Sequence, residues 1–161
     1  MYLFDADSLI LANRHDFPID KDPGTFWRFL EDMGNQGQIR IPEAVFDEIG
    51  RRDDSLNKWL SARRHIFLVP TIDALPHMGQ VLNAYGPITE VDLEELNKKA
   101  DPYLVAHALA LGATVVTNEA SQPGVTSPLN KKTPDICSSL GVACIRYPRF
   151  LWEMKPQLPL V

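Results

Sequence analysis

The chain opens with Met1-Tyr2-Leu3-Phe4-Asp5-Ala6-Asp7-Ser8, in which a short apolar run ends at an acidic residue. A second apolar run, at residues 113–116, ends in the same way in Thr117-Asn118-Glu119. We expect both runs to be strands. In open α/β sheets, ligands bind beyond the carboxyl ends of the strands, so two such exits can bring together carboxylates from distant parts of the chain. The pattern therefore predicts a site at one edge of a sheet.

Strand-like and helix-like segments alternate along the rest of the chain. Further strands are expected at residues 38–41, 67–69 and 142–147. Helices are expected at residues 25–33, 42–49, 72–85, 91–100, 101–111, 134–140 and 148–155, with one more that begins at a cap formed by Asp54 or Ser55. Loops are expected at residues 13–24 and 119–133. This alternation predicts an α/β fold with a central parallel sheet and helices on both faces.

The helix expected at residues 101–111 has the clearest start in the sequence. Asp101 suits the N-cap and Pro102 the first helical position, because the Asp side chain satisfies free amides and proline presets φ. Gly112 suits the position just past the helix end. The long loop at residues 119–133 exceeds most connections in compact domains, which favours a role in binding.

Composition sets limits on the class of protein. The 161 residues are 45% hydrophobic and 23% charged, which predicts one globular domain over residues 1–161. The opening residues lack a basic region before Asp5, and no apolar run approaches the roughly 18 residues of a membrane span. We therefore expect a cytoplasmic protein.

The cysteines and histidines give no zinc or disulfide signature. Cys137 and Cys144 fall in a helix-like and a strand-like segment without CxxC spacing, and the four histidines form no HExxH pair. We expect two reduced core thiols in preference to a disulfide or a zinc site.

The net charge of −5 argues against a general electrostatic grip on nucleic acid. Basic residues nevertheless cluster in three parts of the sequence: Arg51, Arg52, Lys58, Arg63 and Arg64; Lys131 and Lys132; Arg146 and Arg149. Two interpretations stay open, an acidic site rimmed by basic residues and ordinary solvated helix faces.

Four carboxylates are candidates for a metal site: Asp5, Glu48, Asp101 and Glu119. Hard divalent ions such as Mg²⁺ or Mn²⁺ prefer carboxylate ligands, and gathered carboxylates repel one another until a cation offsets the repulsion. Simpler roles compete with this one. Asp101 could be only an N-cap and Glu48 only an exposed helix residue, whereas Asp5 follows a buried strand and must find partners or become neutral.

Four segments of the sequence form a pattern that spans nearly the whole chain: Tyr2-Leu3-Phe4-Asp5-Ala6-Asp7-Ser8-Leu9-Ile10, Ile41-Pro42-Glu43-Ala44-Val45-Phe46-Asp47-Glu48-Ile49, Ala100-Asp101-Pro102-Tyr103-Leu104-Val105-Ala106-His107-Ala108 and Val115-Val116-Thr117-Asn118-Glu119. In order and spacing, these segments resemble the PIN-domain ribonucleases, and most closely a PIN-like branch among bacterial toxin candidates related to VapC-type toxins. The resemblance implies a three-layer α/β/α PIN-like fold with a central parallel sheet.

The resemblance also implies a function and a set of site residues. It implies hydrolysis of single-stranded RNA with Mg²⁺ or Mn²⁺ as cofactor, with Asp5, Glu48, Asp101 and Glu119 as catalytic residues. Asp5, Asp101 and Glu119 are the expected metal ligands. Glu119 stands where such proteins usually carry Asp, so Asp135 is an alternative fourth carboxylate.

Further roles complete the prediction. Supporting positions around the metal site are Asp7, Ser8, Thr117 and Asp135. Candidates for binding RNA phosphates are Arg51, Arg52, Lys131 and Lys132. The resemblance implies an antitoxin as protein partner and a possible homodimer. The dimer contact would use apolar residues of the middle helices, Trp59, Leu60, Leu75, Met78 and Leu82, unless these fill the core of the monomer.

Two other functions compete. In a phosphatase of the haloacid dehalogenase type, Asp5 would be the nucleophile of Asp5-Ala6-Asp7-Ser8, with Lys131 and Asp135 completing the site. The stretch between Thr117 and these two residues is too short for the strand and helix that such a domain normally carries there. The third possibility is a PIN-like scaffold that binds RNA or protein without cutting.

Overall fold

Five parallel strands form one sheet in the computed structural model of the protein, which describes residues 1–21 and 24–158. The strands are β1 (Tyr2–Phe4), β2 (Ile39–Pro42), β3 (Leu68–Val69), β4 (Thr114–Thr117) and β5 (Cys144–Arg146). Their order is β3-β2-β1-β4-β5. The direction of strand addition therefore reverses between β1 and β4, and such a reversal is where open α/β sheets bind ligands.

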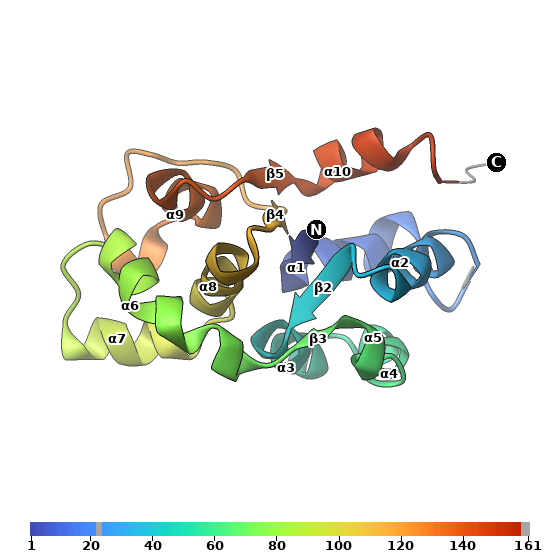
Figure 1. The fold of residues 1–161 in the computed structure, drawn as a ribbon, viewed down its shortest axis with the longest axis horizontal. Helices are drawn as coiled ribbons and strands as arrows, with labels where there is room; N and C mark the ends of the chain where they lie inside the picture. The colour runs from blue at the N-terminus through green and yellow to red at the C-terminus, as the bar shows by residue number, and fades with distance from the viewer. Residues whose placement is uncertain (22–23, 159–161) are drawn as a thin grey trace.

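Helices cover both faces of this sheet, which confirms the expected α/β class (Figure 1). On one side lie α6, α8 and α9, and on the other lie α2 and α10. The helices are α1 (Ala6–Leu11), α2 (Phe26–Asn35), α3 (Glu43–Arg52), α4 (Asp54–Ser61), α5 (Arg64–Phe67), α6 (Leu75–Ala84), α7 (Glu90–Asn97), α8 (Asp101–Leu111), α9 (Thr133–Leu140) and α10 (Tyr147–Met154).

Alternating side chains of the central strands divide the core into two halves. Leu3 and Val115 pack into the cluster under α6, α8 and α9, whereas Phe4 and Val116 pack into the cluster on the opposite face. All four are fully buried. Because successive strand residues point to opposite faces, β1 and β4 must be apolar on both sides, and this explains their continuous hydrophobic runs.

The structure differs from the expected elements mainly near the start of the chain. Residues 6–16, which include the first part of the expected loop at 13–24, form α1 followed by a π-helical turn, Ala12–Asp16, and residues 22–23 lie outside the described part. Asp5 caps α1, and that cap was the overlooked signal. The cap of α4 is Asp53, whose side chain accepts from the Leu56 amide at 3.2 Å, so the prediction of Asp54 or Ser55 was wrong by one or two residues.

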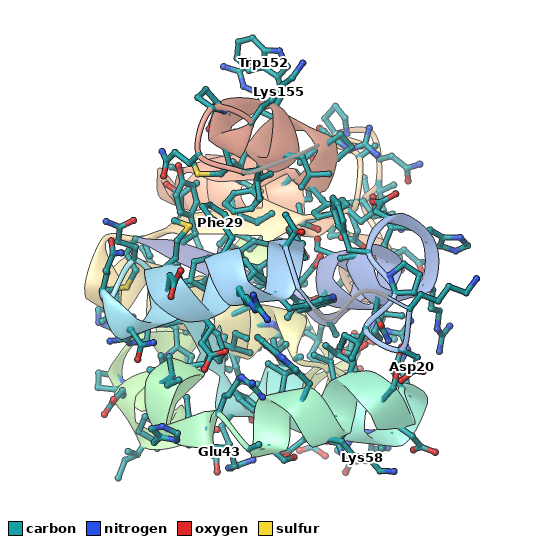
Figure 2. All side chains as sticks on the ribbon, turned by 90° about the vertical axis from the view of Figure 1, so that its right-hand side faces the viewer. Asp20, Phe29, Glu43, Lys58, Trp152 and Lys155 are labelled. Carbon is teal, nitrogen blue, oxygen red and sulfur yellow. The ribbon has the colours of Figure 1, made fainter. Side chains whose placement is uncertain are left out.

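The apolar residues proposed for a dimer contact belong largely to the core of the monomer. Leu60 is 1% exposed and Met78 is 9% exposed, whereas Leu75 is 55% exposed. The largest exposed aromatic side chain of the described residues lies elsewhere: Trp152 projects from α10 (Figure 2) and is 68% exposed.

Cys137 and Cys144 are free thiols on α9 and β5, as expected. Within residues 1–21 and 24–158, no helix combines the length and apolar character needed to cross a membrane.

Two helical glycines give a test of the packing. A Cβ on Gly34 of α2 would lie 2.5 Å from a ring carbon of buried Phe67, whereas a Cβ on Gly79 of α6 would meet no atom within 4 Å. We expect Gly34→Ala to lower the free energy of unfolding by about 1–3 kcal/mol through overpacking. Gly79→Ala should raise it by about 0.5–1 kcal/mol, because alanine loses less backbone entropy in a helix.

Urea denaturation of the two variants and the parent protein measures both effects. Equal stabilisation by both substitutions would contradict the close contact between α2 and α5.

Candidate metal site

Asp5 lies where β1 ends, and its carboxylate connects the exits of two neighbouring strands. One oxygen, Oδ1, accepts from the Ser8 amide at 2.7 Å, and the other, Oδ2, accepts from the Asn118 amide at 3.3 Å. The Asp5 amide donates to the carbonyl of Val116 on β4 at 3.0 Å. The residue is 5% exposed, and burial raises the pKa of its carboxyl group to about 6, although hydrogen bonding at Ser8 opposes the rise.

Asp101 is the first residue of α8, and its carboxylate has no capping bond. The prediction that Asp101 is the N-cap was wrong, because Ala100 occupies that position and its carbonyl accepts from the Leu104 amide at 3.0 Å. Within the described residues we find no hydrogen bond or ion pair to the Asp101 carboxylate. Its side chain is therefore available for a ligand.

The position of Asp101 follows from the topology of the chain. Helix α8 leads into β4 and runs antiparallel to the strands, so it begins at the edge of the sheet where β1 ends. Burial, together with the charges of Glu119, Asp5 and Glu48, raises the pKa of the Asp101 carboxyl group to about 7. The start of a helix favours an anion by roughly 0.3–1 kcal/mol, which is too little to offset these effects.

Glu119 follows β4 and reaches the same edge of the sheet. Its amide donates to Thr117 Oγ1 at 3.1 Å, and its own Oε2 accepts from the Thr133 amide at 2.8 Å. Lys132 Nζ lies 3.9 Å from the other carboxylate oxygen. Thr117 is fully buried, so it fixes the turn at which Glu119 leaves the strand.

Glu48 and Asp7 are joined by one arginine at the rim. Arg52 donates from Nη1 to Glu48 Oε1 at 2.8 Å, and its Nη2 lies 2.8 Å from Asp7 Oδ1. Glu48 is half-buried on α3, and Asp7 is exposed on α1. Glu48 and Asp7 therefore share an ion-pair partner, whereas Asp5 and Asp101 have none within the described residues.

Asp135 has structural contacts that separate it from the other acids. Asp135 accepts from the Ser121 hydroxyl and, at 2.8 Å, from the Gln122 amide, so its carboxylate holds the long loop against α9. It is not among the charges that raise the pKa of Asp101, whereas Glu119 has the largest effect of them. The geometry favours Glu119 over Asp135 as the fourth carboxylate. The hydroxyl of Ser8 is buried without a hydrogen-bond partner among the described residues.

The donors suit a hard divalent ion, although they do not form a complete ligand shell. Within the described residues, no three Asp, Glu, His or Cys side chains are close enough to hold one ion together. Mg²⁺ commonly uses one or two protein carboxylates and keeps several waters. Asp5 and Asp101 are the candidates for such a pair, because the charge of Asp5 raises the pKa of Asp101.

The basic residues predicted to bind RNA occupy different places. Arg51 and Arg52 line a cavity of about 370 Å³ together with Glu48 and Asp101. Lys131 lines another cavity, of about 290 Å³, beside Asp135, and its Nζ lies 3.5 Å from the carbonyl of Ala84.

Sequence reasoning missed Lys98 and Lys99, which line the cavity of Asp101 with Arg51 and Arg52. Their place directly before Ala100 and Asp101 was a signal that we did not use. They directly follow α7, in which half of the residues are acidic, so the net charge of this segment of the sequence does not indicate a basic site.

A family model with the description "Domain of unknown function (DUF4411)" matches residues 2–158. A chain of the crystal structure of VapBC2 from Rickettsia felis, bound to a DNA fragment from their promoter, is similar with a TM-score of 0.51 and 16% sequence identity. The match covers 90% of the present chain and 97% of that chain. Comparison with curated proteins finds no match. The structural likeness supports the expected PIN-like α/β fold with a central parallel sheet.

The raised pKa values predict how stability without metal depends on pH. Each folded pKa lies above the unfolded value of 3.8, so the folded state binds more protons and loses stability as pH rises from about 4 to about 7. At pH 8 without divalent ions, we expect Asp101→Asn to raise the free energy of unfolding by about 1–2 kcal/mol, after allowance for partial exposure of Asp101 and for the lost charge at the helix start.

Thermal unfolding of the parent, Asp101→Asn and Asp54→Asn at pH 5 and pH 8 in a chelator measures this effect. The gain of Asp101→Asn should shrink at pH 5, and exposed Asp54 should give less than about 0.5 kcal/mol at either pH. Comparing variants is necessary because burial lowers the pKa of His107, which makes stability rise with pH over part of the same range. A loss of stability in Asp101→Asn at pH 8 would contradict the account.

Proposed function

The chain belongs to the family described as Domain of unknown function (DUF4411), and we propose that it is a divalent-metal-dependent ribonuclease that hydrolyses single-stranded RNA. The observation that carries the proposal is Asp101, a carboxylate without a hydrogen-bonding partner among the described residues, whose pKa is raised to about 7 by burial and by neighbouring acids. Keeping such carboxylates close together where the strand order reverses lowers the stability of the fold. A bound divalent cation offsets that cost.

In this proposal Asp5 and Asp101 would hold the ion, and Glu119 would reach it through water. When bound, the ion would neutralise charge on the phosphoryl oxygens of the scissile phosphodiester. The hydrogen bonds from Ser8 and Asn118 fix the orientation of Asp5, and burial restricts the access of competing water.

Glu119 is the better candidate for orienting or deprotonating the attacking water. One of its oxygens is fixed by the Thr133 amide, while the other has, among the described residues, only Lys132 at 3.9 Å. Glu48 is held at 2.8 Å by Arg52, so its role in the proposal is to position that arginine and to raise the pKa of Asp101 through its charge. A general base must reach the proton it removes, and the more weakly held oxygen of Glu119 meets this condition more readily.

The biological role in the proposal is that of a toxin with an antitoxin partner. It is supported by the likeness to a chain of the VapBC2 structure, in which VapBC2 is bound to a DNA fragment from their promoter. We also propose that a homodimer is possible, with exposed Leu75 as the part of the predicted contact that the core leaves free.

The phosphatase alternative has less support from the site. Asp5 is 5% exposed and both of its oxygens accept amide hydrogen bonds, which is a poor arrangement for a nucleophile that must attack a phosphoester. Lys131 and Asp135 line a separate cavity instead of completing the surroundings of Asp5.

Cleavage of a labelled single-stranded RNA by purified protein with Mn²⁺ or Mg²⁺ tests the proposal. We expect Asp5→Asn and Asp101→Asn to reduce the cleavage rate at least about 100-fold, because each removes a metal ligand and its negative charge. Glu119→Gln should also reduce the rate strongly, and a chelator should abolish cleavage.

Asp135→Asn is the matched control, since it removes a carboxylate from outside the cluster, and it should keep most of the activity. Equal cleavage by the parent, Asp5→Asn and Asp101→Asn would contradict the assignment. A covalent phosphoryl adduct at Asp5 would support the phosphatase instead, and RNA binding without cleavage would support the scaffold.

A further inference from the structure

Two cavities adjoin the start of α8 and share one wall. The first, of about 370 Å³, contains Glu48 and Asp101. The second, of about 540 Å³, contains Thr71 and Tyr103. Both are lined by Arg51, Lys98, Lys99 and Ala100, so they lie next to each other between α3 and the α7–α8 junction, and we call the two together the groove. In Figure 1, α3 and α7 both lie on the lower side of the molecule.

We propose that this groove binds the single-stranded RNA backbone and leads it to Asp101, with Arg51, Lys98 and Lys99 on the phosphates and Tyr103 against a base. The inference rests on the proposed function and adds to it the path of the substrate.

The charges of the groove support a polyanionic ligand. Arg51 is exposed and has no ion pair within the described residues. In the part of the chain that the structure describes, Lys98 pairs only with exposed Glu95, at 2.8 Å and three positions earlier in the sequence, a contact worth about a few tenths of a kcal/mol. Lys99 donates one hydrogen bond to the carbonyl of Leu129 at 2.9 Å, which leaves its charge uncompensated. Three cations available to a ligand therefore gather in one groove of a chain whose net charge is −5.

The other basic residues are less available. Arg52 lines the same groove, but Asp7 and Glu48 both pair with it at 2.8 Å. Lys132 lies close to Glu119, and Lys131 lies in a different cavity. We therefore assign the phosphate contacts to Arg51, Lys98 and Lys99 in place of the lysines of the long loop.

Tyr103 gives a reason to expect a single strand. It lies on α8, two residues after Asp101, and is partly buried against the core under α6, α8 and α9. A ring supported on one side by the core and facing a cavity on the other provides a surface on which an unpaired base can stack. Thr71 and the exposed Asn97 line the same cavity and offer polar groups near that base.

Binding can be measured separately from catalysis in the Asp101→Asn background. The probe is a fluorescent single-stranded oligoribonucleotide of mixed sequence, without divalent ions, and the readout is anisotropy over a series of salt concentrations. We expect Arg51→Ala and Lys98→Ala each to weaken binding about 3- to 10-fold. Each should also reduce the slope of log K against log salt by about 0.7, the value for one phosphate contact on a single strand.

Matched variants make the result specific to the groove. Lys58→Ala removes one charge from exposed Lys58 on α4 (Figure 2) and should leave binding and slope unchanged. Tyr103→Phe should bind RNA as the Asp101→Asn background does, because the ring is kept. Tyr103→Leu should bind more weakly because the ring is lost, but the slope of log K against log salt should stay the same because no charge changes. Thermal unfolding of each variant identifies any substitution that acts by destabilising the fold.

The outcomes separate this inference from the proposed function. Unchanged binding in the groove variants, together with a loss on Lys131→Ala, would overturn the groove while leaving the ribonuclease intact. Absence of both RNA binding in Asp101→Asn and RNA cleavage by the parent protein would overturn the proposed function and the groove together.

Discussion

The candidate site depends on two carboxylates, buried Asp5 and half-buried Asp101, that have no cation of their own within the described residues. Burial raises the pKa of Asp5 to about 6 and that of Asp101 to about 7, so near neutral pH each is poised between its charged and neutral forms. Structural carboxylates are usually paired, as Glu48 and Asp7 are with Arg52. Asp5 and Asp101, which lack such a partner within the described residues, are therefore best explained as ligands for a bound cation.

The parallel sheet creates this site by its strand order. Strands β2 and β4 lie on opposite sides of β1, which leaves a crevice at the carboxyl ends of β1 and β4. Acidic residues follow both of these strands. Helix α8 must run back to begin β4, which brings Asp101 to the same edge. The apolar sequences of β1 and β4, needed for two-sided burial, thus also exclude water from the acids that follow them.

Much of this was predictable because it rests on local patterns. The five strands follow from short apolar runs, and the convergence of Asp5, Glu119 and Asp101 follows from the rule that parallel strands end at a common edge. The sequence patterns do not predict which groups each side chain contacts in the folded protein. Asp101 looked like an N-cap, yet Ala100 has that position, and Asp135 looked like a ligand, yet it holds the long loop. Lys98 and Lys99 became visible only when folding placed them beside Arg51.

The central claim is that Asp5 and Asp101 are buried carboxylates kept ready for a divalent cation. Titration of the side-chain carboxyl carbons by nuclear magnetic resonance, with and without Mg²⁺, measures this directly. The account predicts pKa values near 6 for Asp5 and near 7 for Asp101 in the metal-free protein, and a fall of both when Mg²⁺ is present, since the ion favours the charged form. Values near 4 for both groups, unchanged by Mg²⁺, would contradict it.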